Sequence, residues 1–163
     1  DMEGSRGLGD VYKRQGELTV HHELDRTVDS IRALADEWHP VRNVGASVAS
    51  GSFRTLGMLL APCSIRTLGE ITSGVTSSLL TRAADVVLKE RRRLVLMVRE
   101  TPLHLGHLRN MVAVTEMGAV VAPPVPAFYA KPESLDEVVT QSVARALDLF
   151  DITLPETHRW TES

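Results

Sequence analysis

The chain has 163 residues, of which 43% are hydrophobic and 24% are charged, and its formal net charge is -3. These values suit one compact globular domain, and they exclude both a disordered chain and a polycationic surface for nucleic acid. No apolar run is long enough to span a membrane. The single cysteine, Cys63, excludes an intrachain disulfide and a cysteine-rich zinc site, and we expect a cytoplasmic protein.

In the first third of the chain, the sequence pattern predicts one helical region between a tail and a loop. Residues 1–15 lack apolar periodicity, so we expect a disordered tail there, and residues 7–15 resemble translated sequencing-adapter sequence, which implies a non-native tail. Apolar residues then recur at helical spacing from residue 17 to about His39, where the following proline ends the predicted helix. Residues 46–54 are rich in serine and glycine and predict a loop, and the apolar run 56–61 predicts a buried strand.

Helices and strands alternate through the rest of the chain. The predicted order is helix 65–71, helix 77–91, strand 94–98, helix 103–117, strand 119–122 and helix 134–150. Short, continuously apolar strands separated by helices predict a doubly wound α/β fold, in which helices cover both faces of a mostly parallel sheet. We expect residues 16–163 to form a single domain.

Candidate ligand-binding residues follow the predicted strands, because ligands of such sheets bind beyond the carboxyl ends of the strands. The turn after the first strand contains Ser64, Ile65, Arg66 and Thr67, whose polar groups could hold a phosphate or simply cap a helix. Arg99 and Glu100 follow the next strand. Partial desolvation there would let Glu100 donate a proton to a leaving phosphate, and an exposed Arg–Glu pair at a turn is the alternative.

Further cations and one aromatic residue lie on the later elements. Arg82 and Lys89 are seven residues apart, which puts them on one helical face where they could bind one phosphate. The run Arg91–Arg93 predicts a solvated helix end. Tyr129 and Arg145 could bind a phosphate monoester, or could equally be an aromatic on a turn and an exposed arginine.

Metal-ligand patterns are weak. His104 and His107 are three residues apart at a predicted helix start, but the sequence offers no third ligand tied to them, so we predict no metal site.

Three motifs resemble, in order and spacing, those of the UbiX-type flavin prenyltransferases, whose fold is Rossmann-like. They are Leu60-Ala61-Pro62-Cys63-Ser64, the stretch from Ser73 to Pro102, and the stretch from Pro123 to Tyr129. The resemblance runs from about Glu17 to Trp160. Family members begin with a strand, a Gly-Ala-Ser-Gly-type loop and a helix that have no match here, so we expect an N-terminally truncated, incomplete domain, and we assign activity to its full-length parent.

The resemblance also implies roles for individual residues. It implies that flavin mononucleotide (FMN) contacts Ser64, Ile65, Arg66, Thr67 and Arg99. It implies that the phosphate of dimethylallyl phosphate contacts Arg82, Lys89, Tyr129 and Arg145. It implies three catalytic residues. Glu100 is the proton donor, Glu23 is a carboxylate beside the flavin, and Lys89 is the third catalytic residue.

The activity that the resemblance implies is the transfer of a dimethylallyl group from dimethylallyl phosphate to reduced FMN, without a metal. The product, prenylated FMN, would serve a UbiD-type decarboxylase in ubiquinone biosynthesis. The resemblance also implies a homo-oligomer whose subunits share the binding pocket. Two alternatives stay open, namely a related FMN-dependent cysteine decarboxylase and a non-catalytic flavin-binding module.

Overall fold

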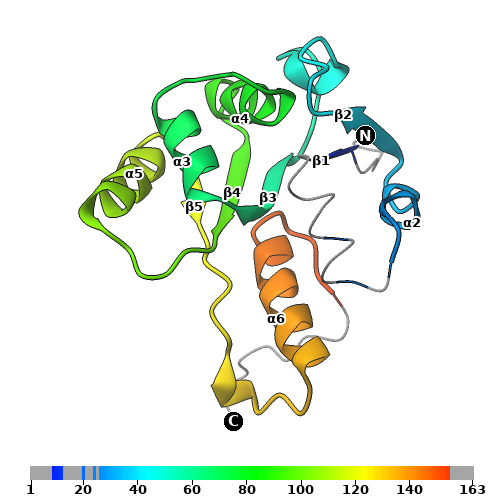
Figure 1. The fold of residues 1–163 in the computed structure, drawn as a ribbon, viewed down its shortest axis with the longest axis vertical. Coiled ribbons are helices and arrows are strands. Elements are labelled where there is room, and N and C mark those ends of the chain that lie inside the picture. The colour runs from blue at the N-terminus through cyan, green and yellow to red at the C-terminus, as the bar shows by residue number, and fades with distance from the viewer. Residues whose placement is uncertain (1–8, 13–19, 21–23, 25, 155–163) are drawn as a thin grey trace.

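The computed structural model describes residues 9–12, 20, 24 and 26–154, and its centre is a sheet of three parallel strands (Figure 1). The strand order is β3-β4-β5. Their bounds are β3 Gly57–Cys63, β4 Arg93–Val98 and β5 Val120–Val121. Leu60 lies opposite Leu96, and Leu96 lies opposite Val121. All carboxyl ends of these parallel strands therefore lie at one edge of the sheet.

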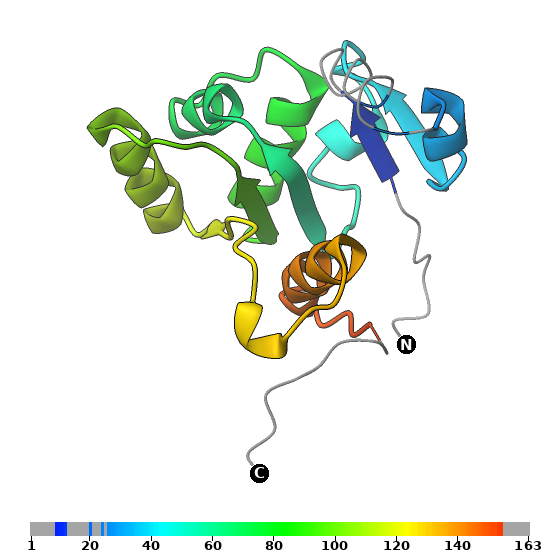
Figure 2. The same ribbon diagram turned by 60° about the horizontal axis from the view of Figure 1, so that its bottom comes forward.

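Helices cover both faces of this sheet, as the turned view shows (Figure 2). On one side lie α3 Ile65–Thr72, α4 Leu79–Lys89 and α5 Leu105–Glu116. On the other side lies α6 Leu135–Asp148, which follows the short 3-10 helix η2 Phe128–Ala130. This arrangement confirms the predicted doubly wound α/β fold with a parallel sheet. In the part of the chain that the structure describes, no helix combines the length and apolarity needed to cross a bilayer.

The core lies between the sheet and α3–α5. Leu68 on α3, Ala84 on α4 and Val114 on α5 are fully buried there, together with Leu94 and Leu96 of β4. All residues from Leu94 to Val98 are buried, so the side chains on both faces of this strand are covered. Burial on both faces explains why β4 is continuously apolar in sequence and was predicted correctly.

Gly57 allows the start of β3 to approach its neighbours closely. Its φ of +148° lies in the region that L side chains rarely adopt. A Cβ atom there would collide with the backbone carbonyl of Arg93 and with the ring of Phe150. The end of the α6 segment and the first residues of β3 and β4 can therefore meet only where residue 57 has no side chain.

Two sequence-based expectations about the N-terminal part are wrong. Gly9–Tyr12 forms a strand, β1, in the region expected to be a tail, and it pairs in parallel with β2 Glu37–Pro40. The helix expected to reach His39 is the short α2 Val28–Arg32. Both errors have one cause, because each strand is defined by a partner far away in the sequence, and local periodicity carries no signal of that pairing. Another short 3-10 helix, η1 Ser47–Ala49, interrupts the predicted loop.

Candidate functional site

Two of the predicted ligand-binding loops lie side by side at the carboxyl edge of the sheet. Ser64 follows β3 directly, and Arg99 and Glu100 follow β4, its hydrogen-bonded neighbour. The backbone N–H of Arg99 donates to the carbonyl of Cys63 at 3.3 Å, which ties the beginnings of the two loops together. The sequence therefore predicted correctly that residues 64–67 and 99–100 follow strands, and the structure shows that these strands are neighbours.

The first loop forms the N-terminal turn of α3. Ser64 caps this helix, since its Oγ accepts the backbone N–H of Thr67 at 3.2 Å and lies 2.9 Å from the Thr67 hydroxyl. The first backbone N–H groups of a helix lack an acceptor within the helix, so those of Ile65 and Arg66 point outward from the positive end of α3. The turn is thus both a helix cap and a potential anion-binding surface, and the two readings of the sequence are compatible.

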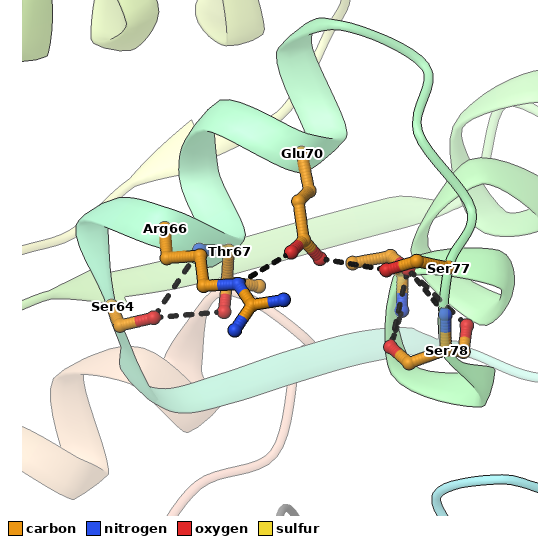
Figure 3. A network of polar contacts seen from close by, with 7 residues as sticks. Ser64, Arg66, Thr67, Glu70, Ser77 and Ser78 are labelled. Carbon is orange, nitrogen blue, oxygen red and sulfur yellow. Dashed lines mark hydrogen bonds and ion pairs between the residues drawn. The ribbon is translucent and has the colours of Figure 1, made fainter.

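A polar network extends from this turn to the loop before α4 (Figure 3). Arg66 donates from Nε to Oε1 of Glu70 at 2.7 Å, and Ser77 donates from its hydroxyl to Oε2 of the same carboxylate at 3.3 Å. The Glu70 side chain is only 15% exposed, whereas that of Arg66 is 82% exposed. Glu70 was not among the predicted site residues, although the spacing of four between opposite charges on a helix was a usable signal.

The second loop exposes both of its predicted functional residues. Arg99 and Glu100 are exposed in the single chain. One carboxylate oxygen of Glu100 accepts the backbone N–H of Thr101 at 3.2 Å. The described part of one chain therefore leaves Glu100 exposed and does not provide the partial desolvation expected for it.

Arg82 and Lys89 share a face of α4 but have separate partners. Arg82 pairs with Asp85 at 3.7 Å, and Lys89 donates to Glu90 at 2.7 Å. Seven residues of helix separate the two cations by roughly 10 Å along the axis. The single phosphate site expected from their spacing is not assembled in this chain.

Lys89 also lies at the opposite edge of the sheet from Glu100. It ends α4 just before β4 begins at Arg93, whereas Glu100 follows the end of β4, roughly 17 Å further along the strand. The hydrogen bond from Lys89 and its positive charge hold the pKa of Glu90 below its ordinary value of 4.5. Lys89 therefore already neutralises a carboxylate within its own chain.

The elements that carry Tyr129 and Arg145, η2 and α6, lie on the far side of the sheet from α4 (Figure 2). Tyr129 is in η2 and is 74% exposed. Arg145 is on α6 and lies 4.0 Å from Asp148. A hollow of about 350 Å³ beside it is lined by Arg145, Asp148, Asp151 and Thr153, so two carboxylates offset the one cation. The single chain does not bring Tyr129 and Arg145 together with Arg82 and Lys89.

The structure describes two of the three remaining candidate residues, His104 and His107. Glu23 lies outside the described residues. His104 caps α5, where its Nδ1 accepts the backbone N–H groups of Gly106 and His107 at 3.0 and 3.4 Å, and its ring stacks on that of His107. Within the described residues, no three His, Cys, Asp or Glu side chains are grouped as a metal would require.

Arg92 corrects the expectation of a solvated helix end. Its two terminal nitrogens donate to the carbonyls of Phe53 and Gly51 at 2.5 and 2.7 Å. The guanidinium thereby fixes a loop about forty residues earlier in the chain. Arg91 and Arg93 are exposed as expected.

Comparison with known proteins identifies the family. The sequence profile of the family described as Flavoprotein matches residues 9–147. A flavin prenyltransferase UbiX of Escherichia coli K12 is 58% identical over 146 residues, which are 90% of this chain and 77% of the relative. The chain belongs to the UbiX-type flavin prenyltransferases. A UbiX of Neisseria meningitidis serogroup B is 57% identical over 150 residues, or 92% of this chain and 79% of the relative.

Solved structures place the chain in the same group. A crystal structure of AnUbiX (PadA1) in complex with FMN and dimethylallyl pyrophosphate matches with a TM-score of 0.93 and 50% identity, covering 95% of this chain and 82% of that one. A dodecameric FMN-dependent UbiX-like decarboxylase from E. coli O157:H7 matches with a TM-score of 0.92 and 44% identity, covering 94% and 83%. The FMN-dependent cysteine decarboxylase TvaF is 16% identical with a TM-score of 0.58, which shows a shared fold alone. The chain is therefore much more similar to the UbiX proteins than to this cysteine decarboxylase, in both sequence and fold.

Proposed function

We propose that this protein is a flavin prenyltransferase, which transfers the dimethylallyl group of dimethylallyl phosphate to reduced FMN. The observation that carries the proposal is the close similarity to flavin prenyltransferases along nine tenths of the chain. The similarity of the fold to a protein in complex with both FMN and a dimethylallyl ester supports the same assignment. The fold thus brings the predicted FMN loops to the edge of the sheet where ligands of such folds bind.

The residues at this edge suit FMN. The backbone N–H groups of Ile65 and Arg66, the guanidinium of Arg66 and the cation of Arg99 are all donors, as an anionic ligand requires. Ser64 and Thr67 hold the turn in place through their mutual hydrogen bonds. Reduced FMN, when bound, supplies the electron-rich ring that receives the dimethylallyl group.

The phosphate of dimethylallyl phosphate is assigned to Arg82, Lys89, Tyr129 and Arg145. These side chains are far apart within one chain, and Tyr129 and Arg145 are largely exposed. We therefore propose that neighbouring subunits of a homo-oligomer complete the phosphate site. The dodecameric state of a UbiX-like protein supports this arrangement.

Glu100 is the proposed proton donor. Its carboxyl group would protonate the phosphate oxygen that departs with the electron pair of the breaking carbon–oxygen bond. Lys89 would stabilise the negative charge that develops on the phosphate, and Glu23 would act beside the flavin. A neighbouring subunit that covers the exposed loop of Glu100 would supply the desolvation that the single chain lacks.

The wider setting of the reaction belongs to the same proposal. We expect prenylated FMN to pass to a UbiD-type decarboxylase in ubiquinone biosynthesis. Reduced FMN and a chain whose single cysteine, Cys63, is buried suit the cytoplasm.

An assay under anaerobic conditions tests the function. The protein is incubated with reduced FMN and dimethylallyl phosphate, and mass spectrometry is used to find FMN that carries one added dimethylallyl group. We expect Glu100→Gln to lower the rate by roughly a hundredfold or more, because proton donation is lost. Glu116→Gln, an exposed carboxylate at the end of α5, serves as the control with an unchanged rate. FMN binding without any adduct would point to a flavin-binding module, and loss of carbon dioxide from a peptidyl cysteine would point to a decarboxylase.

A further inference from the structure

Glu70 connects two segments that border the proposed FMN site. Its two carboxylate oxygens have different partners, since Oε1 accepts from Nε of Arg66 and Oε2 accepts from the hydroxyl of Ser77 (Figure 3). Its backbone carbonyl also accepts the N–H of Val75 at 2.8 Å. One residue on the last turn of α3 therefore fixes both the first turn of the same helix and the loop that leads into α4.

The contact with Arg66 leaves the functional end of that side chain available. Glu70 occupies Nε, so the two terminal nitrogens of the guanidinium remain outside this ion pair. Those nitrogens form a planar fork that suits an anionic oxygen pair. An arginine that is 82% exposed would otherwise sample many rotamers, and ligand binding would have to restrict them.

We propose that Glu70 is a positioning residue for FMN, which holds Arg66 so that its terminal nitrogens face the flavin nucleotide. This inference rests on the proposed function, because Arg66 is an FMN contact only if the protein binds FMN. The largely buried position of the Glu70 carboxylate keeps its own orientation fixed, as a positioning role requires. Its second bond, to Ser77, prevents the carboxylate from following Arg66 into solvent.

Charge and geometry make opposite predictions for this residue. FMN carries a negative phosphate, so the negative charge of Glu70 by itself opposes binding, and its removal would tighten the complex. Positioning of Arg66 favours binding, and its loss would weaken the complex. The direction of the change in affinity therefore distinguishes the two effects.

Binding of FMN to the full chain, measured by calorimetry, tests the proposal with three variants. Glu70→Asp keeps the charge but is too short to reach both partners, and Glu70→Ala lacks both charge and reach. We expect each to raise the Kd for FMN by roughly threefold to tenfold, the range set by the entropy of ordering one flexible side chain. Glu70→Gln retains an acceptor for Arg66 and a donor for Ser77, so we expect a Kd within about twofold of the original.

The double variant Arg66→Ala/Glu70→Ala supplies a control for indirect effects. If Glu70 acts through Arg66, removal of Glu70 from the Arg66→Ala protein causes no further loss of FMN affinity. Tighter binding by Glu70→Ala, weaker binding by Glu70→Gln than by Glu70→Asp, or equal affinities throughout would each overturn the proposal. If the unmodified protein binds FMN and forms the adduct while the Glu70 variants bind equally well, only the positioning role fails. If the unmodified protein does not bind FMN, the proposed function fails with it.

Discussion

At the scale of single residues, Arg92 is a structural cation in a run that otherwise faces solvent. Arg92→Lys keeps the charge but cannot bridge the carbonyls of Gly51 and Phe53 as the planar guanidinium does. We expect a loss of about 1 to 2 kcal/mol in the free energy of unfolding, measured by urea denaturation. Arg91→Lys, at the exposed neighbouring position, should change this free energy by less than about 0.5 kcal/mol. Equal effects of the two substitutions would contradict the structural role of Arg92.

Glu90 offers a prediction about pH at the same scale. Because Lys89 lowers the pKa of Glu90 in the folded protein, their contact stabilises the fold above pH 4.5, and this contribution is lost as the pH falls through the lowered value. We expect an NMR titration of the Glu90 carboxyl carbon to give a midpoint below 4.5, and Lys89→Met to move it upward. Arg99→Met, at the opposite edge of the sheet, should leave the midpoint unchanged. A midpoint that does not respond to Lys89→Met would refute the pairing.

The positions of candidate site residues could be predicted from sequence where the residues follow one another along the chain. Residues 64–67 and the pair 99–100 were placed correctly at strand ends because each set follows one strand. Arg92 was missed for a different reason. Its role depends on which groups lie nearby in space, and it contacts residues 39 and 41 positions earlier.

At the scale of secondary structure, the start of α4 depends on a capping box. Ser78 accepts the backbone N–H of Thr81 at 3.3 Å, and the Thr81 side chain accepts the backbone N–H of Ser78 at 3.2 Å. We expect Ser78→Ala to lower the free energy of unfolding by about 1 kcal/mol, measured by chemical denaturation. Ser73→Ala, at the exposed end of α3, is the matched control and should cost much less. The prediction fails if both changes cost the same.

The same scale explains which elements could be predicted. The helices α3, α4 and α6 begin at serine caps, α5 ends just before Gly118, and β4 is a continuous apolar run, so local sequence was sufficient for them. The pair β1 and β2 has four residues per strand and little apolar character. Its existence depends on pairing between segments more than twenty residues apart, which local patterns do not encode.

At the scale of the whole molecule, two helices present apolar faces to solvent. Leu105, Leu108 and Val112 form a stripe at helical spacing on α5, on the side away from its buried residue Val114. A second stripe on α6 consists of Leu135, Val139 and Val143. Exposed apolar stripes of this kind usually mark surfaces of association, which agrees with the proposed homo-oligomer.

The two stripes give a prediction about assembly. A charge at the centre of either one, Leu108→Glu or Val139→Lys, should reduce the molar mass measured by sedimentation velocity, because burial of the charged group would cost several kcal/mol. Arg91→Glu changes an exposed charge that lies on neither helix and should leave the mass unaltered. An unaltered assembly in both stripe variants would rule out these surfaces as contacts between subunits.

The absence of a side chain at Gly57 has a consequence for the relation between the two sides of the molecule. The helix that bears Arg145 is followed directly by Phe150, whose ring lies against residue 57. The addition of even one methyl group would wedge this segment outward and alter where the arginine stands. The position of this arginine relative to the sheet therefore depends on a hydrogen atom in place of a side chain at residue 57.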